Sequence, residues 1–201
     1  MTISIFAYVA ILLLVSSALF AEPFSHEGVY ASAAMGLGYA SFENANGEIS
    51  MTADGLGVKL QGKVGYYVVR NLAWHANLGF VMYSNFREAR YGLPVEMDHD
   101  FYVISSVFLG TGVTYYVQQL HNVFISGSLG FTGYRMNTRM EYGNTGLKAF
   151  SFGAEIGKEW WVSERVGFGT SLAFDSGDYW SDRDGVFRSS SIMLMFSVTF
   201  N

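Results

Sequence analysis

Four charged side chains interrupt segments that otherwise alternate between large apolar and smaller residues. Lys59 and Lys63 share one face of this two-residue alternation in "GLGVKLQGKVGYYVV", and Glu155 and Glu159 share one face of "FSFGAEIGKEWW". Charges away from water are unfavourable alone and are tolerated as pairs of opposite sign. The pattern therefore predicts an ion-pair network of these four residues; separate hydration of each charge is the alternative.

Other residue types that could carry chemistry form no complete motif. The stretch "EMDHD" (96–100) could offer Asp98, His99 and Asp100 to a metal, but a solvated acidic loop is the commoner meaning of such a run. The acidic residues of "DSGDYWSDRDG" (175–185) do not have the spacing of a calcium-binding EF-hand. No serine lies beside a histidine in a recognisable catalytic motif, and no glycine-rich phosphate loop is present. No catalytic, cofactor-binding or metal-binding residue is predicted, and the chain is not expected to be an enzyme.

The composition excludes several classes of protein. The 201 residues carry a net charge of −5, which argues against nucleic acid as a partner because such binding needs a basic surface. Half of the residues are hydrophobic and 14% are charged, which excludes disorder. There is no cysteine, so packing and hydrogen bonds must hold the fold without disulfides.

The first 21 residues, "MTISIFAYVAILLLVSSALFA", form an uncharged apolar run that ends in small residues. This pattern predicts a secretory signal peptide over residues 1–21, cleaved after Ala21, and leaves residues 22–201 as one domain. A retained membrane anchor is the alternative, although the run is near the short limit of about 17–25 residues for a spanning helix.

The rest of the chain alternates with a period of two, which indicates β-strands. In the last segment, Ile192, Leu194 and Phe196 share one parity, whereas Ser191 and Ser197 share the other. Eight strands are predicted, at about 28–42, 55–68, 72–86, 100–117, 122–135, 148–162, 166–177 and 188–200. Short turns are expected near 69–71, 118–121 and 163–165, and long polar loops near 43–54, 87–99, 136–147 and 178–187.

A pair of aromatic residues precedes each short turn. Aromatic rings favour the boundary between hydrocarbon and water, so such pairs indicate where strands leave a membrane. The pair members of outward parity are predicted to form an aromatic girdle: Tyr66, Tyr115 and Trp160. The opposite face is rich in Gly, Ser, Ala and Thr, which suits the narrow interior of an eight-stranded barrel. The prediction is an all-β, eight-stranded, antiparallel, up-and-down transmembrane β-barrel; a soluble lipocalin-like barrel with its apolar face inside is the alternative.

The signal peptide, the eight strands and the alternation of short turns with long loops resemble the small outer-membrane β-barrels, such as the OmpA membrane domain, OmpX and OmpW. The resemblance covers the whole mature chain without selecting one family. Members commonly end in an aromatic residue, and here Phe200 is followed by Asn201. The resemblance implies a Gram-negative type of outer membrane, with outer-membrane lipid, lipopolysaccharide and the barrel-assembly machinery as partners. It also places the short turns and the girdle on the periplasmic side.

In such a barrel, the second and sixth strands lie opposite each other. Lys59 and Lys63 on one strand would then face Glu155 and Glu159 across the lumen, with His75 and Asn77 as neighbours. The expected function is an integral outer-membrane barrel with a plugged lumen and a structural or surface-interaction role. A narrow channel for small or apolar solutes is the first alternative, and a lipid-modifying enzyme is the second. The surface ligand is not identified by the sequence.

Overall fold

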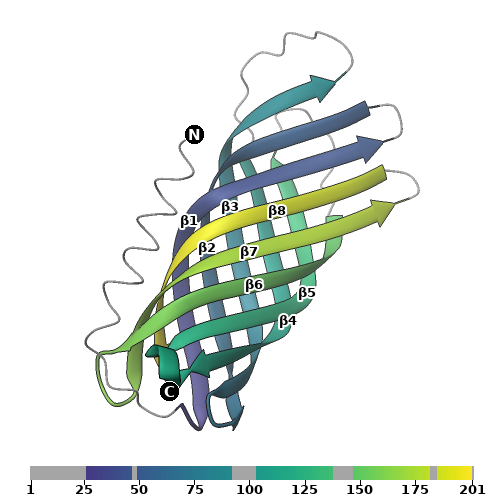
Figure 1. The fold of residues 1–201 in the computed structure, drawn as a ribbon. Coiled ribbons are helices and arrows are strands. Elements are labelled where there is room, and N and C mark those ends of the chain that lie inside the picture. The colour runs from purple at the N-terminus through teal and green to yellow at the C-terminus, as the bar shows by residue number, and fades with distance from the viewer. Residues whose placement is uncertain (1–25, 47–48, 92–102, 138–146, 182–184, 201) are drawn as a thin grey trace.

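The computed structural model is a closed β-barrel (Figure 1). It describes residues 26–46, 49–91, 103–137, 147–181 and 185–200. The strands are β1 (Val29–Asn46), β2 (Ile49–Val69), β3 (Leu72–Tyr91), β4 (Val103–Val117), β5 (Val123–Asn137), β6 (Leu147–Trp161), β7 (Val166–Ser181) and β8 (Gly185–Phe200). All neighbouring strands pair antiparallel, and β8 pairs with β1 to close the ring. This confirms the predicted fold class.

The predicted signal peptide, residues 1–21, lies outside the described residues. Its presence and its cleavage after Ala21 therefore remain predictions. No helix in the described part of the chain is long and apolar enough to cross a membrane.

Tight turns connect the strands at one end of the barrel, here called the short-turn end. Between β2 and β3 the chain reverses at Asn71, whose φ of 67° lies in the left-handed region. Between β4 and β5, the 3-10 helix η2 (Gln118–Leu120) is followed by His121 and Asn122, with φ of 54° and 62°. Asparagine and histidine are among the non-glycine residues that adopt this conformation most readily. These turns lie where the sequence predicted them.

The strands are longer than predicted at the opposite end, here called the long-strand end. Residues 43–54 were predicted as a loop, but β1 and β2 run through most of this range and pair up to Asn46 and Ile49. Likewise β7 and β8 continue to Ser181 and Gly185 within the predicted loop at 178–187. Apolar periodicity ends where the membrane ends, whereas a backbone ladder continues in water wherever two strands still pair. The predicted loops at 87–99 and 136–147 fall largely outside the described residues.

The two faces of the barrel wall differ in the way that membrane strands require. Leu37 and Val64 point outward with 66% and 64% of their surface exposed, and Phe196 is also exposed. Lys63 and Ser197 point inward and are buried. This rules out the lipocalin-like alternative, in which the apolar face would be inside.

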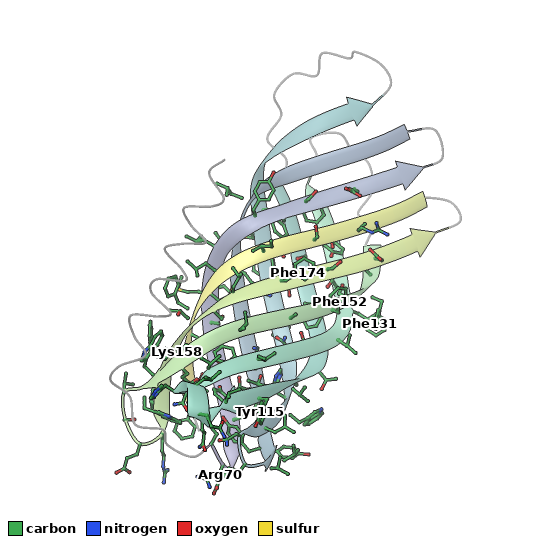
Figure 2. The ribbon with its side chains drawn as sticks, viewed as in Figure 1. Arg70, Tyr115, Phe131, Phe152, Lys158 and Phe174 are labelled. Atoms are coloured by element: carbon green, nitrogen blue, oxygen red, sulfur yellow. The ribbon has the colours of Figure 1, made fainter. Side chains whose placement is uncertain are left out.

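The outward apolar residues form a continuous belt of the height of a bilayer core. On β2 the belt runs from Leu56 to Tyr66. The ten steps between these residues, at about 3.3 Å each and tilted by roughly 40°, span roughly 25 Å. Polar side chains follow beyond the belt at the long-strand end, as Ser41 and Glu43 do on β1. In Figure 2, Arg70 and Tyr115 lie at the short-turn end, and Phe131 lies higher on the outside of the wall.

Two glycines of β1 allow it to close against β8. A β-carbon at Gly38 would overlap the carbonyl oxygen of Ile192, and one at Gly36 would overlap the sulfur of Met195. The missing side chains leave room for the fully buried Met193 and Met195, which point into the lumen from β8. A narrow closed ring requires such close packing where β1 meets β8.

The belt yields a prediction about the outward face. Met35 lies on β1 in the middle of the belt, so Met35→Arg should destabilise the barrel in lipid vesicles by about 2–4 kcal/mol. Ser41→Arg, at the edge of the belt on the same strand, should cost about 0–1 kcal/mol. Denaturant titration of both variants in vesicles measures the difference. Equal costs at the two positions would contradict the proposed depth of the belt.

Candidate functional site

The lumen contains a buried ion pair that joins opposite walls of the barrel. Lys63 on β2 reaches Glu155 on β6, with 2.7 Å between Nζ and Oε2 and with side chains only 7% and 8% exposed. The second carboxylate oxygen of Glu155 accepts a hydrogen bond of 2.6 Å from the Ser171 hydroxyl. Lys63 also donates to Ser126, at 3.4 Å. The pair therefore crosses the lumen, and polar partners from β5 and β7 surround it.

Lys59 is paired with a carboxylate that is not among the four residues of the predicted network. Its ammonium lies 2.6 Å from Oδ2 of Asp175 on β7, and Ser191 donates to the same oxygen at 3.4 Å. A signal for Asp175 was present, since it has the inward parity of Ser171 and Ala173 within the same predicted strand. It was considered only as part of an acidic loop.

Glu159 lies closer to the short-turn end than either lysine pair. It is fully buried, and its carboxylate accepts a hydrogen bond of 3.3 Å from the hydroxyl of Tyr116. The lysine ammonium groups are placed against Glu155 and Asp175 instead. Of the four residues predicted to act together, the structure thus pairs only Lys63 and Glu155 with each other.

His75 connects to the ion pair through hydroxyl groups. Its Nε2 lies 3.0 Å from the hydroxyl of Thr114, which in turn donates to Ser126 at 2.9 Å. Ser126 accepts from Lys63, so the chain of contacts runs from β3 through β4 and β5 to β2. Asn77, the other predicted neighbour, is buried on the same inward face of β3.

Aromatic layers close the lumen on both sides of the charged groups. At the long-strand end, the ring of Phe42 packs edge-on against Tyr83 and Tyr134, with centroid distances of 5.0 and 6.0 Å. Tyr134 is also hydrogen-bonded to Ser189 across the lumen. This layer was not predicted, although its residues have the inward parity.

At the short-turn end, the inward members of the three aromatic pairs gather around His26. Its ring stacks on Tyr116 at 3.8 Å between centroids and lies 4.7 Å from Trp161. Its Nδ1 is 3.1 Å from the hydroxyl of Tyr67. His26 was not identified from the sequence, because it precedes the first strand and takes part in no periodic pattern.

Between these layers the described side chains leave little space. A cavity of about 30 Å³ lies near Lys59, Asp175 and Tyr134. Cavities of about 10 Å³ flank the Lys63–Glu155 pair on its two sides. About 10–15 Å³ of such space accommodates one water molecule, so each of these three cavities has room for one or two waters and is too small to be a bore for hydrated ions.

The outward members of the three aromatic pairs lie at the short-turn end, where the sequence predicts them. Tyr66 and Tyr115 are exposed, and Tyr66 packs beside Trp74 at 5.6 Å between centroids. Trp160 is partly exposed and lies 5.6 Å from the ammonium of Lys158. Their role as a girdle at a membrane interface remains a prediction.

The two acidic stretches considered for metal binding gain no support. Residues 96–100 lie outside the described part of the chain. Asp175 of the second stretch is engaged by Lys59, and Asp178 lies 3.2 Å from Arg188. Among the described residues, no three histidine or acidic side chains are grouped so as to hold a metal ion.

The chain is similar to known proteins in its fold, at low sequence identity. No protein-family model matches the chain, and no curated protein matches it either. Neisserial surface protein A aligns over 89% of this chain and 99% of its own, with 14% identity and a TM-score of 0.51. The outer membrane protein OprG from Pseudomonas aeruginosa aligns over 88% of this chain and 98% of its own, with 12% identity and a TM-score of 0.50. The chain therefore has the fold of the small outer-membrane β-barrels, and no single family among them is selected.

The lumenal ion pair yields a prediction about coupling. Lys63→Met or Glu155→Gln alone should destabilise the barrel by about 3–5 kcal/mol, because each leaves an uncompensated buried charge. The double variant should lose clearly less than the sum of the single losses. The exposed pair Arg188 and Asp178, changed to Met and Asn, serves as a control with an expected coupling of at most about 1 kcal/mol. Denaturant titrations give the cycle, and additive losses at the lumenal pair would contradict this account.

Proposed function

We propose that the chain is an integral outer-membrane β-barrel with a plugged lumen and a structural or surface-interaction role, without catalysis. The observation that carries the proposal is the Lys63–Glu155 pair, which spans the lumen between two aromatic layers. Closure of an eight-stranded barrel leaves an interior just wide enough for side chains. The charged and aromatic side chains fill that interior, so a steady aqueous pore is not expected.

The proposed location depends on the outward belt and on the predicted export signal. A belt of roughly 25 Å suits the hydrocarbon core of a bilayer. Cleavage after Ala21 and insertion by the barrel-assembly machinery would place the short turns in the periplasm and the long-strand end outside, in contact with lipopolysaccharide. The two proteins compared above are described as a surface protein and an outer membrane protein, which is consistent with this location.

The surface role rests on the strands that extend beyond the belt. Figure 1 shows β1, β2, β3, β7 and β8 projecting together past the rest of the wall at the long-strand end. At the base of this projection, the register places Glu43 and Asp178 on either side of Arg188. Arg188 and Asp178 are each 60% exposed, so this charged face is open to contact with molecules outside the cell.

Conductance in planar lipid bilayers tests the plug. The natural chain should show no steady open pore, because the lumenal ion pair and both aromatic layers block the path. Replacing Lys63 and Glu155 by alanine, together with Phe42 and His26, should give measurable conductance. This variant lacks the lumenal ion pair and the ring at the centre of each aromatic layer. The matched control replaces Arg188 and Asp178 by alanine outside the lumen and should remain closed.

A large steady conductance of the natural chain would overturn the proposal in favour of a channel. Liposome-swelling assays would then identify the solutes that pass. A change in the mass spectrum of lipid A between cells with and without the protein would instead indicate a lipid-modifying enzyme.

A further inference from the structure

Three residues before the first strand run beside the end of β2 and the turn after it, and one of them places its ring in the mouth of the lumen at the short-turn end. These residues, His26, Glu27 and Gly28, are here called the strap. The carbonyl of Gly28 accepts a hydrogen bond from the backbone of Tyr67 at 2.9 Å, and the carbonyl of His26 accepts one from Asn71 at 3.2 Å. Gly28 has a φ of 84°, a conformation that glycine adopts readily because it has no β-carbon.

The strap inserts one ring into the mouth and leaves its other side chain outside. His26 is 0% exposed, whereas the adjacent Glu27 is exposed. The imidazole contacts Tyr67, Tyr116 and Trp161, which come from β2, β4 and β6. One ring from outside the strands therefore fills the space between aromatic side chains on three alternate strands.

The two ends of the lumen are closed in different ways. At the long-strand end, Phe42, Tyr83 and Tyr134 all belong to strands, so the barrel ladder itself holds the layer in place. At the short-turn end the central ring belongs to the strap, which lies outside the strand ladder and is held by backbone hydrogen bonds to Tyr67 and Asn71 and by the contacts of the His26 ring. A short segment outside the ladder opens locally at lower free energy than the ladder strands do.

We propose that the strap is a detachable seal and that the lumen opens first at the short-turn end, when His26 leaves its aromatic site. This inference rests on the proposed plugged lumen and adds which end of it can open and which residue closes it. Release of the strap frees the ring of Tyr116, on which His26 stacks, and Tyr116 also lines the cavity that Ser197 and the Lys63–Glu155 pair border. The opened mouth is a pocket that faces the periplasm in the proposed orientation.

The accessibility of an introduced cysteine tests the seal. The natural chain has no cysteine, so all labelling comes from the introduced thiol. Ser197→Cys places a thiol in the cavity that Tyr116 separates from the strap, and Ser106→Cys places one in the cavity at the long-strand end. Each reporter is combined with His26→Ala, and the folded protein in detergent is treated with a small charged methanethiosulfonate. Loss of the stacked ring should make labelling at position 197 about tenfold faster and leave labelling at position 106 within about twofold.

Two further variants control for the strap itself. Glu27→Ala removes an exposed side chain from the strap and should leave both labelling rates unchanged. His26→Phe keeps a ring for stacking but loses the contact with Tyr67, so its effect at position 197 should be smaller than that of His26→Ala. Heat-modifiable migration on a gel confirms that each variant is folded before labelling.

The outcomes separate this inference from the function on which it rests. Rapid labelling of Ser197→Cys with His26 intact would overturn the plugged lumen itself. Slow labelling that His26→Ala does not accelerate would overturn the seal and leave the plug standing. An equal acceleration at both reporters would also overturn the seal, since it would show a general loosening of the barrel.

Discussion

Closure of the backbone ladder is the constraint on which this structure depends. In hydrocarbon no water can satisfy an unpaired N–H or C=O group, so a sheet in a membrane has no free edge. The register of β1 with β8 meets this demand over fifteen residue pairs, from Ala31 with Phe200 to Ala45 with Val186. Gly36 and Gly38 make the seam possible, because any β-carbon there would collide with the neighbouring strand. With eight strands, closure also sets the lumen width, and every inward side chain must fit within it.

The narrow lumen in turn explains its chemistry. Lys59 and Lys63 are almost completely buried, and each reaches a carboxylate on the far side of the ring. An unpaired charge in such a space would be strongly unfavourable, whereas a pair whose remaining oxygens and protons meet hydroxyl groups is tolerated. Serine and threonine from several strands supply those hydroxyls, including Ser171 to Glu155 and Ser191 to Asp175. The aromatic layers then separate this polar zone from both openings. The ion pairs and the aromatic rings therefore block the same path through the lumen.

Two different rules determine how long the strands are. Within the belt, lipid contact selects large apolar residues at alternate positions, which is why hydrophobic periodicity located every strand. Beyond it, pairing continues without that selection, and β1 and β2 extend to Asn46 and Ile49 in a stretch whose composition resembles a loop. The register between β2 and β3 shifts between Asp54 and Leu56, where these strands leave the belt. Such an irregularity bends a strand and increases its twist, which fits the projection of β2 and β3 beyond the belt.

The sequence by itself determined the number of strands, the antiparallel order and the face on which each side chain lies. The two-residue periodicity is a local property of each strand. Once the barrel closes, one face of that periodicity becomes the lumen side and the other becomes the lipid side. It also placed Lys63 and Glu155 on facing strands. The tertiary structure alone decided which charges meet: strand tilt and stagger pair Lys59 with Asp175 and leave Glu159 near Tyr116. The position of His26 was equally beyond sequence patterns, since one residue outside the strands has no periodicity. Heights within a barrel depend on the shear of the whole ring, a global quantity that no single segment encodes.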